Sequence, residues 1–162
     1  MTKVLLGLGS NVNKEQSISK AIKLLADTFV NMRISPTFES KSIGFNGDNF
    51  YNLVVSVDTD QTLEEVIATY RRIEDACGRD RSGPKFGPRT LDIDILIYGD
   101  VICREPVELP RDEIEINAFV LWPLSLIEPD MVHPVNGQTY KELWQQYVNE
   151  QKLWLIEAPW DQ

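Results

Sequence analysis

The chain has 162 residues, of which 43% are apolar and 25% charged, and its formal net charge is −9. This composition predicts one globular domain over residues 1–162, and the acidic balance excludes nucleic acid or an anionic membrane as the main partner. No segment reaches the length of a membrane span, and the only cysteines, Cys77 and Cys103, form no disulfide or zinc motif. We therefore expect a cytoplasmic protein with reduced thiols.

The N-terminal residues predict a strand followed by a helix. Residues Lys3 to Leu8 form a short apolar run broken by glycines, which is typical of a buried strand. The glycines do not continue into a dinucleotide-binding fingerprint, because the third glycine of that motif would fall at Val12. Asn13, followed three residues later by Gln16, has the pattern of a capping box for a helix that runs to about Asp27.

Two further strands and a second helix are predicted next. The strands cover Met32 to Phe38 and Tyr51 to Thr59, where apolar and polar residues alternate in the second. Thr62 and Glu65 form a second capping-box pattern, and apolar residues recur behind them at helical spacing. Gly78 stands where a glycine commonly ends a helix.

A basic loop then leads directly into a strand with two acids. In that strand, Asp92 and Asp94 alternate with isoleucines, so both carboxylates project from one face and the isoleucines from the other. The loop before the strand carries four cations against the single acid Asp80, although the whole chain is acidic. These cations are Arg79, Arg81, Lys85 and Arg89.

This pairing of charges indicates a site for a small polyanion and a metal ion. Two carboxylates this close repel each other unless a cation lies beside them, and Mg²⁺ suits such oxygen ligands because it takes its other ligands from water and phosphates. Arginines match phosphate oxygens. Together these groups predict phosphoryl transfer. The simpler alternative is a solvated strand face beside a solvated loop.

The order of elements predicts the fold. A β-α-β-β-α-β sequence is typical of the ferredoxin-like arrangement, an α+β fold in which an antiparallel sheet carries both helices on one face. Residues from Asp100 onward form a C-terminal extension, with a strand or hairpin in residues 101–109 and a helix from Thr139 to Val148. His133, the only histidine, is expected to be structural rather than catalytic.

Six motifs, in order along nearly the whole chain, closely resemble the 6-hydroxymethyl-7,8-dihydropterin pyrophosphokinase family. Among these, GPRTLDIDI is specific, whereas GSN alone is weak. The motifs are GLGSN (Gly7–Asn11), FYN (Phe50–Asn52), RIE (Arg72–Glu74), GRDR (Gly78–Arg81), FGPRTLDIDIL (Phe86–Leu96) and FVLWPL (Phe119–Leu124).

The resemblance implies transfer of pyrophosphate from ATP to the hydroxymethyl oxygen of a reduced pterin in folate biosynthesis, with release of AMP. By this likeness, Asp92 and Asp94 hold two Mg²⁺ ions that bridge the triphosphate. Arg79 and Arg89 are the catalytic residues that stabilise charge on the phosphates. The expected ATP-binding residues are Glu74, Arg81, Phe86 and Arg111.

The resemblance also implies a pterin site in a monomer whose partners are ATP and the reduced pterin. Asn52 is expected to bind the amide edge of the pterin, and Phe119 to stack on its ring. The segment that begins at Ser40 and contains Ile43 and Gly44 is expected to close over the pterin. An aromatic ring and an amide suit a flat heterocycle that forms hydrogen bonds.

The chain departs from the family pattern on the side expected to hold ATP. Arg111 and Asp112 follow Pro110, where typical members carry His and often an aromatic residue, and Asn117 stands where Arg is common. Three outcomes are open. ATP binds more weakly, Arg111 takes over a phosphate contact, or the protein is a diverged pterin- or nucleotide-binding paralogue with altered or lost catalysis.

Overall fold

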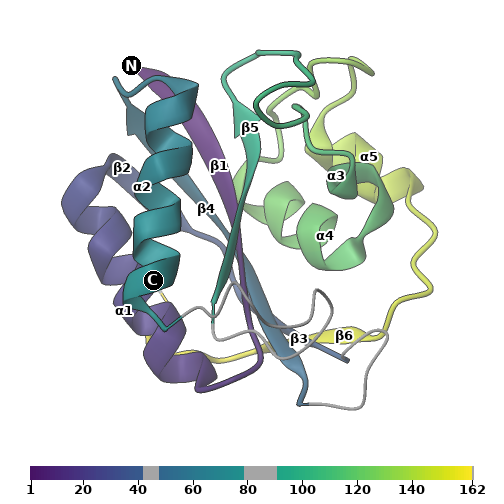
Figure 1. Ribbon diagram of the computed structural model, residues 1–162. Coiled ribbons are helices and arrows are strands. Elements are labelled where there is room, and N and C mark those ends of the chain that lie inside the picture. Colours follow the sequence, from purple (N-terminus) through teal and green to yellow (C-terminus); the bar gives the residue numbers. More distant parts are fainter. Residues whose placement is uncertain (42–47, 79–90, 162) are drawn as a thin grey trace.

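One antiparallel sheet separates two groups of helices (Figure 1). The computed structural model describes residues 1–41, 48–78 and 91–161. We call the sheet face covered by α1 and α2 the first face, and the face covered by α3, α4 and α5 the second face. The elements are β1 (Thr2–Ser10), α1 (Lys14–Thr28), β2 (Val30–Ile34), β3 (Thr37–Ser40), β4 (Phe50–Thr59), α2 (Leu63–Ala76), β5 (Asp92–Tyr98), α3 (Glu113–Ile116), α4 (Ala118–Ile127), α5 (Tyr140–Gln146) and β6 (Leu153–Ile156).

The strand order confirms the predicted α+β fold with a ferredoxin-like core. The sheet runs β5-β1-β4-β3-β6, β2 also pairs with β4, and every pairing is antiparallel. The prediction of one strand from Met32 to Phe38 was wrong, because two strands, β2 and β3, occupy that stretch. The chain breaks at Pro36, which has no N–H to donate, while Ser35 exchanges hydrogen bonds with Val54 through its backbone and its Oγ.

On the first face, α1 and α2 form the apolar layer of two helices that the sequence predicts. The capping box of Thr62 and Glu65 is confirmed at the start of α2, and Gly78 has φ 84° just beyond its end. The capping box predicted at Asn13 was wrong. Asn13 adopts a left-handed conformation with φ 48°, and its side chain makes no capping hydrogen bond, since that bond requires an extended backbone at this position.

A β-bulge in β5 changes which residues share a face. β1 pairs Leu6 with Ile95 but Leu5 with Ile97, so Leu96 is an extra residue. Ile93 and Ile95 pack with α1 and α2, as predicted, whereas Leu96 and Ile97 both pack on the second face. The expectation that all the isoleucines share one face was therefore wrong for Ile97.

The helices of the C-terminal extension cover the second face, whereas Leu109, near its start, packs with the first-face cluster. The hairpin expected in residues 101–109 consists of a single bridge between Cys103 and Leu109. The predicted last helix forms as α5, and β6, which the sequence pattern did not predict, adds to the sheet beside β3. Within the described residues, no helix is both long and apolar enough to cross a membrane.

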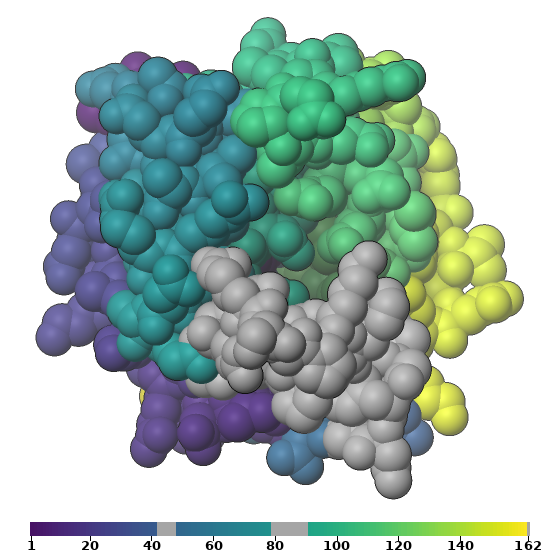
Figure 2. Space-filling model, viewed as in Figure 1, coloured from purple at the N-terminus to yellow at the C-terminus, as the bar shows by residue number. Residues whose placement is uncertain are grey.

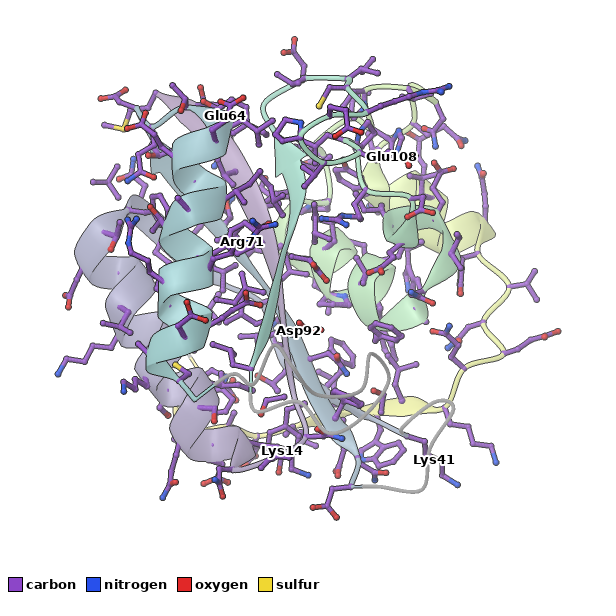
Figure 3. All side chains as sticks on the ribbon, in the orientation of Figure 1. Lys14, Lys41, Glu64, Arg71, Asp92 and Glu108 are labelled. Atoms are coloured by element: carbon purple, nitrogen blue, oxygen red, sulfur yellow. The ribbon has the colours of Figure 1, made fainter. Side chains whose placement is uncertain are left out.

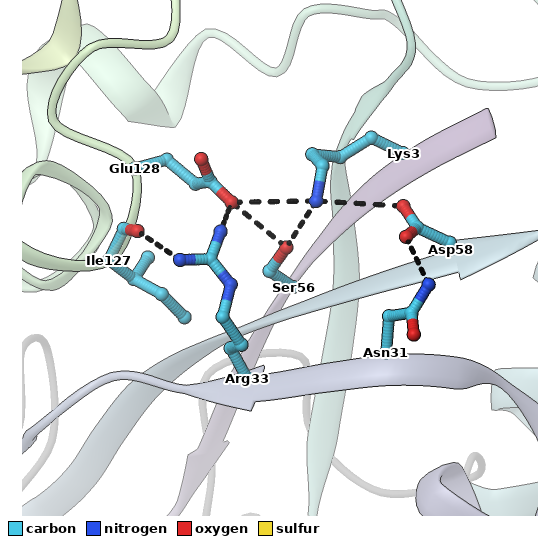
Figure 4. A network of polar contacts seen from close by, with 7 residues as sticks. All are labelled: Lys3, Asn31, Arg33, Ser56, Asp58, Ile127 and Glu128. Carbon is cyan, nitrogen blue, oxygen red and sulfur yellow. Dashed lines mark hydrogen bonds and ion pairs between the residues drawn. The ribbon is translucent and has the colours of Figure 1, made fainter.

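A polar network fixes the end of α4 to the sheet (Figure 4). Glu128 Oε1 accepts a hydrogen bond from Ser56 Oγ at 3.1 Å and forms ion pairs with Lys3 and Arg33. Arg33 also donates to the carbonyl of Ile127 at 3.2 Å, and Lys3 pairs with Asp58 at 3.5 Å. Since residues 3 and 9 of β1 are six positions apart, this anchor lies about 20 Å from the Gly9 end of the strand.

Candidate active site

The two acids of β5 lie on the second face, opposite glycines of the neighbouring strand. Asp92 pairs with Gly9, and Asp94 pairs with Gly7. Figure 3 places Asp92 on β5 between α2 and α4, and Figure 2 shows the surface hollowed between these two helices. Because glycine has no side chain, the backbone of β1 leaves space beside Asp92, whereas the side chain of Leu96 packs over Gly7.

A row of residues across three strands forms the floor of this site. Asp92 on β5, Gly9 on β1 and Asn52 on β4 are direct cross-strand partners. Neighbouring strands are about 4.8 Å apart, so the backbone of Asp92 lies about 10 Å from that of Asn52. A Cβ on Gly9 would stand only 3.3 Å from Asn52 Oδ1. The glycine therefore lets the amide oxygen lie close over the sheet.

The amide of Asn52 is fixed by Ser40. Asn52 is only 7% exposed, and its Nδ2 donates to Ser40 Oγ at 2.7 Å. This contact orients the amide so that Oδ1 lies on the Gly9 side. The structure thus brings together two of the residues predicted to bind the pterin, on the same floor as the predicted metal ligands.

Two of the predicted ATP-binding residues, Glu74 and Arg111, hold the outer edge of β5. Glu74 is 3% exposed, and its Oε2 accepts from the backbone N–H of Ile93 at 2.8 Å. Arg111 donates from Nε to Ile95 O at 3.2 Å and from its backbone N–H to Leu96 O at 2.9 Å. Edge strands leave such groups unpaired unless other elements cover them. These contacts fix the strand that carries the acids.

The surroundings of Asp94 are rich in ionisable groups. Arg111 Nη2 lies 3.9 Å from Asp94 Oδ1. Burial, followed by the charge of Asp94, raises the pKa of the Glu113 carboxyl, and the same two causes raise the pKa of Tyr70. The sequence interpretation missed Glu113, because one acid among the neighbouring Asp112 and Glu115 at the start of a four-residue helix carries no recognisable pattern.

The two carboxylates of β5 suit a metal ion that takes most of its other ligands from water and substrate. In residues 1–41, 48–78 and 91–161, no group of three His, Cys, Asp or Glu side chains is arranged to hold a metal ion. Two carboxylates on one strand face would leave the remaining coordination positions to water and phosphate oxygens. Mg²⁺ accepts this arrangement, whereas a structural Zn²⁺ site requires about four protein ligands.

Phe119 lies in the first turn of α4, where it packs against the apolar cluster of the second face and stays partly exposed. Asn117, the residue just before α4, occupies its N-cap position. The other predicted site residues lie outside the described residues, so the structure does not test them. They are Ile43, Gly44, Arg79, Arg81, Phe86 and Arg89.

The family model of 7,8-dihydro-6-hydroxymethylpterin-pyrophosphokinase matches residues 5–129, which is most of the chain. The chain belongs to this family. It is 39% identical over 145 residues to the 2-amino-4-hydroxy-6-hydroxymethyldihydropteridine pyrophosphokinase of Aquifex aeolicus, and that alignment covers 88% of this chain and 90% of the relative. It is 36% identical to the protein of the same name in Methylorubrum extorquens, with coverage of 88% and 91%.

Solved structures of this pyrophosphokinase family share the fold. A wild-type Plasmodium falciparum HPPK-DHPS crystal structure superposes with a TM-score of 0.69 at 14% sequence identity. Another HPPK-DHPS structure, in complex with substrates, gives a TM-score of 0.72 at 12% identity. Both superpositions cover 91% of this chain but less than half of the larger chain, 44% and 43% respectively. At these identities the likeness supports the fold alone.

Proposed function

We propose that this protein transfers the pyrophosphoryl unit of ATP to the hydroxymethyl oxygen of 6-hydroxymethyl-7,8-dihydropterin, releasing AMP in folate biosynthesis. The observation that carries the proposal is the floor of the site, where the acids of β5 face the fixed amide of Asn52 across Gly9. Family membership over residues 5–129 supports the same reaction.

The length of the floor suits this pair of substrates. The backbones of Asp92 and Asn52 are about 10 Å apart, two strand spacings, which leaves room for one bicyclic ring with its hydroxymethyl group directed toward the acids. Asn52 Oδ1 accepts hydrogen bonds from the N–H groups at the far edge of the ring, and Phe119 covers the face of the ring. The acceptor oxygen is then held where in-line attack depends on positioning and charge neutralisation.

Asp92 and Asp94 are the proposed ligands of two Mg²⁺ ions that accompany ATP. When bound, these ions neutralise charge on the phosphates and orient the triphosphate. The chain fixes the two carboxylates through the contacts of Glu74 and Arg111 with the backbone of β5. Arg79 and Arg89 are proposed to stabilise charge on the transferred group. We further propose that Arg81 and Phe86 contact ATP. The segment containing Ile43 and Gly44 is proposed to close over the pterin.

An assay of AMP release from ATP and 6-hydroxymethyl-7,8-dihydropterin, with and without Mg²⁺, tests this function. Asp92→Asn and Asp94→Asn preserve side-chain size but remove the charge, and each is expected to lower kcat at least about 1,000-fold while the fold is retained. Asp100→Asn, at an exposed position just after β5, is the matched control and keeps full activity. Metal-independent AMP release that survives both site variants would contradict the proposal.

One observation favours a second function, a pterin- or nucleotide-binding protein without turnover. Arg111 is already engaged with Ile95 O and Asp94, so a phosphate must draw its guanidinium away from the strand. In this case calorimetry detects pterin binding, but no AMP forms. A turnover above about 0.1 per second, within the ordinary range of enzymes, excludes this second function.

The remaining expectations belong to the same proposal. We propose that residues 1–162 act as a single domain, that the active form is a monomer, and that the protein works in the cytoplasm without nucleic acid. The support for a single domain is that both apolar clusters pack on opposite faces of one sheet. Analytical ultracentrifugation of the active protein tests the monomer, and a dimeric active species would overturn it.

A further inference from the structure

The chain after α5 links two parts of the proposed pterin site, the start of α4 and strand β3. It runs from α5 along the second face to β6 (Figure 1). At its start, Tyr147 Oη donates to the carbonyl of Ile116 at 2.5 Å. At its end, β6 pairs with β3, placing Leu153 opposite Ser40. This segment therefore contacts the residue that precedes Asn117 and the residue that orients Asn52.

Gln151 is the residue of this segment that holds the start of α4. Its Oε1 accepts from the backbone N–H of Ala118 at 2.7 Å, and its Nε2 donates to Asn117 Oδ1 at 2.9 Å. The first N–H groups of a helix have no partner within the helix, and Asn117 makes no capping contact with its own side chain. Gln151 supplies this cap from 33 residues further along the chain.

Gln151 is itself held in place on both sides. Its backbone N–H donates to Asn149 Oδ1 at 2.8 Å. The next residue, Lys152, accepts from the backbone N–H of Lys41 at 3.4 Å, directly after Ser40. The capping amide is thus tied within two residues to the strand that carries Ser40, so one short segment contacts both the start of α4 and the end of β3.

We propose that Gln151 is a positioning residue for the pterin site, because it fixes Phe119 at the start of α4 relative to the Ser40–Asn52 pair. Phe119 follows Ala118 directly, so the cap sets where the first turn of α4 begins and how the ring stands over the floor. Asn117 takes part because it accepts from the same amide. The inference rests on the proposed function, since it assigns Phe119 and Asn52 to the binding of the pterin.

The test compares three variants in equilibrium titrations with 6-hydroxymethyl-7,8-dihydropterin in the presence of Mg²⁺ and α,β-methylene ATP, which give the Kd, and in steady-state assays of AMP release with ATP, which give the KM values. Gln151→Ala removes both contacts and is expected to raise the Kd and the KM for the pterin about tenfold, while the KM for ATP stays within about twofold. Gln151→Glu keeps an oxygen acceptor for the Ala118 N–H and adds favourable charge at the helix start, and the Asn117 amide turns to donate its N–H to the new carboxylate, so the variant restores most of the affinity. Gln145→Ala, on the exposed side of α5, is the control and has no effect.

The outcomes separate the two proposals. If the wild-type protein does not bind the pterin, the proposed function is contradicted and this inference with it. If the wild type binds and Gln151→Ala binds equally well, the inference alone is overturned. A parallel rise in the constants for pterin and ATP also overturns it, because a general loss of structure would not be selective. Circular dichroism of each variant confirms that the compared proteins are folded.

Discussion

The two faces of the sheet are built from different kinds of contact. The first face consists of regular apolar packing, in which α1 and α2 bury residues at helical spacing against alternate residues of β1, β4 and β5. The second face also has an apolar cluster, but its helices are held in place by side chains that bond to the backbone of distant segments. Examples are the contacts of Arg111 with β5, of Gln151 with the start of α4 and of Arg33 with the end of the same helix.

The two kinds of contact serve different purposes: packing on the first face stabilises the fold, and hydrogen bonds on the second face position the site residues. Apolar packing contributes a large free energy that depends little on the orientation of the groups in contact, so it suits a layer that only has to stabilise the sheet. Hydrogen bonds are weaker in net terms but fix direction, so they suit the layer that must place Asp92, Asn52 and Phe119 relative to one another. Substitutions on the first face are therefore expected to change unfolding, and substitutions on the second face are expected to change ligand binding.

The largest effect on stability is expected from Leu25→Ala on the first face. Leu25 lies in α1 and is fully buried, so its truncation removes apolar contacts and leaves a cavity, at a cost of about 2–5 kcal/mol in the free energy of unfolding. Urea unfolding measures this loss, while kcat/KM of the folded fraction stays near the wild-type value. Lys23→Ala, at an exposed position on the same helix, is the control. A loss below about 1 kcal/mol would show that this layer can collapse around the gap.

A smaller but selective effect is expected from Gly9→Ala on the second face. The new Cβ would stand 3.3 Å from Asn52 Oδ1 and 3.9 Å from the carbonyl of Tyr51, so the amide must move by a few tenths of an ångström. We expect the KM for the pterin to rise about tenfold, equivalent to about 1.4 kcal/mol, while the KM for ATP changes little. Steady-state kinetics with each substrate varied in turn measures this split.

Gly7→Ala is the matched control for Gly9→Ala. Gly7 lies two residues earlier in the same strand and on the same face, but the nearest atoms to a Cβ there belong to the side chain of Leu96, at 3.5 Å or more, which is ordinary packing distance. We expect the KM for the pterin to stay within about twofold. Equal effects at the two glycines would mean that strand distortion, and not the contact with Asn52, explains the loss.

The first face was largely predictable from the sequence because its signals are local. The capping box of Thr62 and the apolar period of α2 depend on residues that are three or four positions apart. The two failures have different causes. Asn13 was assigned a capping role that requires an extended backbone, and the division of β2 from β3 depends on Pro36 together with a Ser35 contact to a strand 19 residues away.

On the second face, the residues could be predicted but their partners could not. The alternation of Asp92 and Asp94 placed both acids on one face, and the family resemblance identified Asn52 and Phe119. The contacts that fix these residues link positions far apart in the chain, such as Arg111 to Ile95 and Gln151 to Ala118. Such pairs leave no periodic signal, because each joins a single side chain to a single backbone group.

The smallest predicted effect concerns His133, a structural residue of the second face, as expected from the sequence. Its side chain is 2% exposed, and its Nδ1 accepts from the backbone N–H groups of Val135 and Asn136, both at 3.2 Å. The proton of the neutral ring is therefore assigned to Nε2, which lies 3.3 Å from Glu115 Oε1 on α3. The ring of Tyr140 packs against the edge of the imidazole. Burial lowers the pKa of His133 below its usual 6.5, although the nearby Glu115 carboxylate opposes the shift.

Protonation of His133 is thus expected to favour the unfolded state. In acid the unfolded chain binds a proton at its histidine near pH 6.5, while the folded protein resists it, so the contribution of His133 to stability is present above about pH 6.5 and is lost as the pH falls below it. His133→Asn keeps an acceptor for the two backbone N–H groups but cannot titrate. The difference in unfolding free energy between wild type and variant should therefore shrink between pH 7.5 and 5.5, by at most about 1.4 kcal/mol per pH unit. Urea unfolding at three pH values measures the difference, and one that grows in acid would mean that the ion pair with Glu115 outweighs the burial of the imidazole.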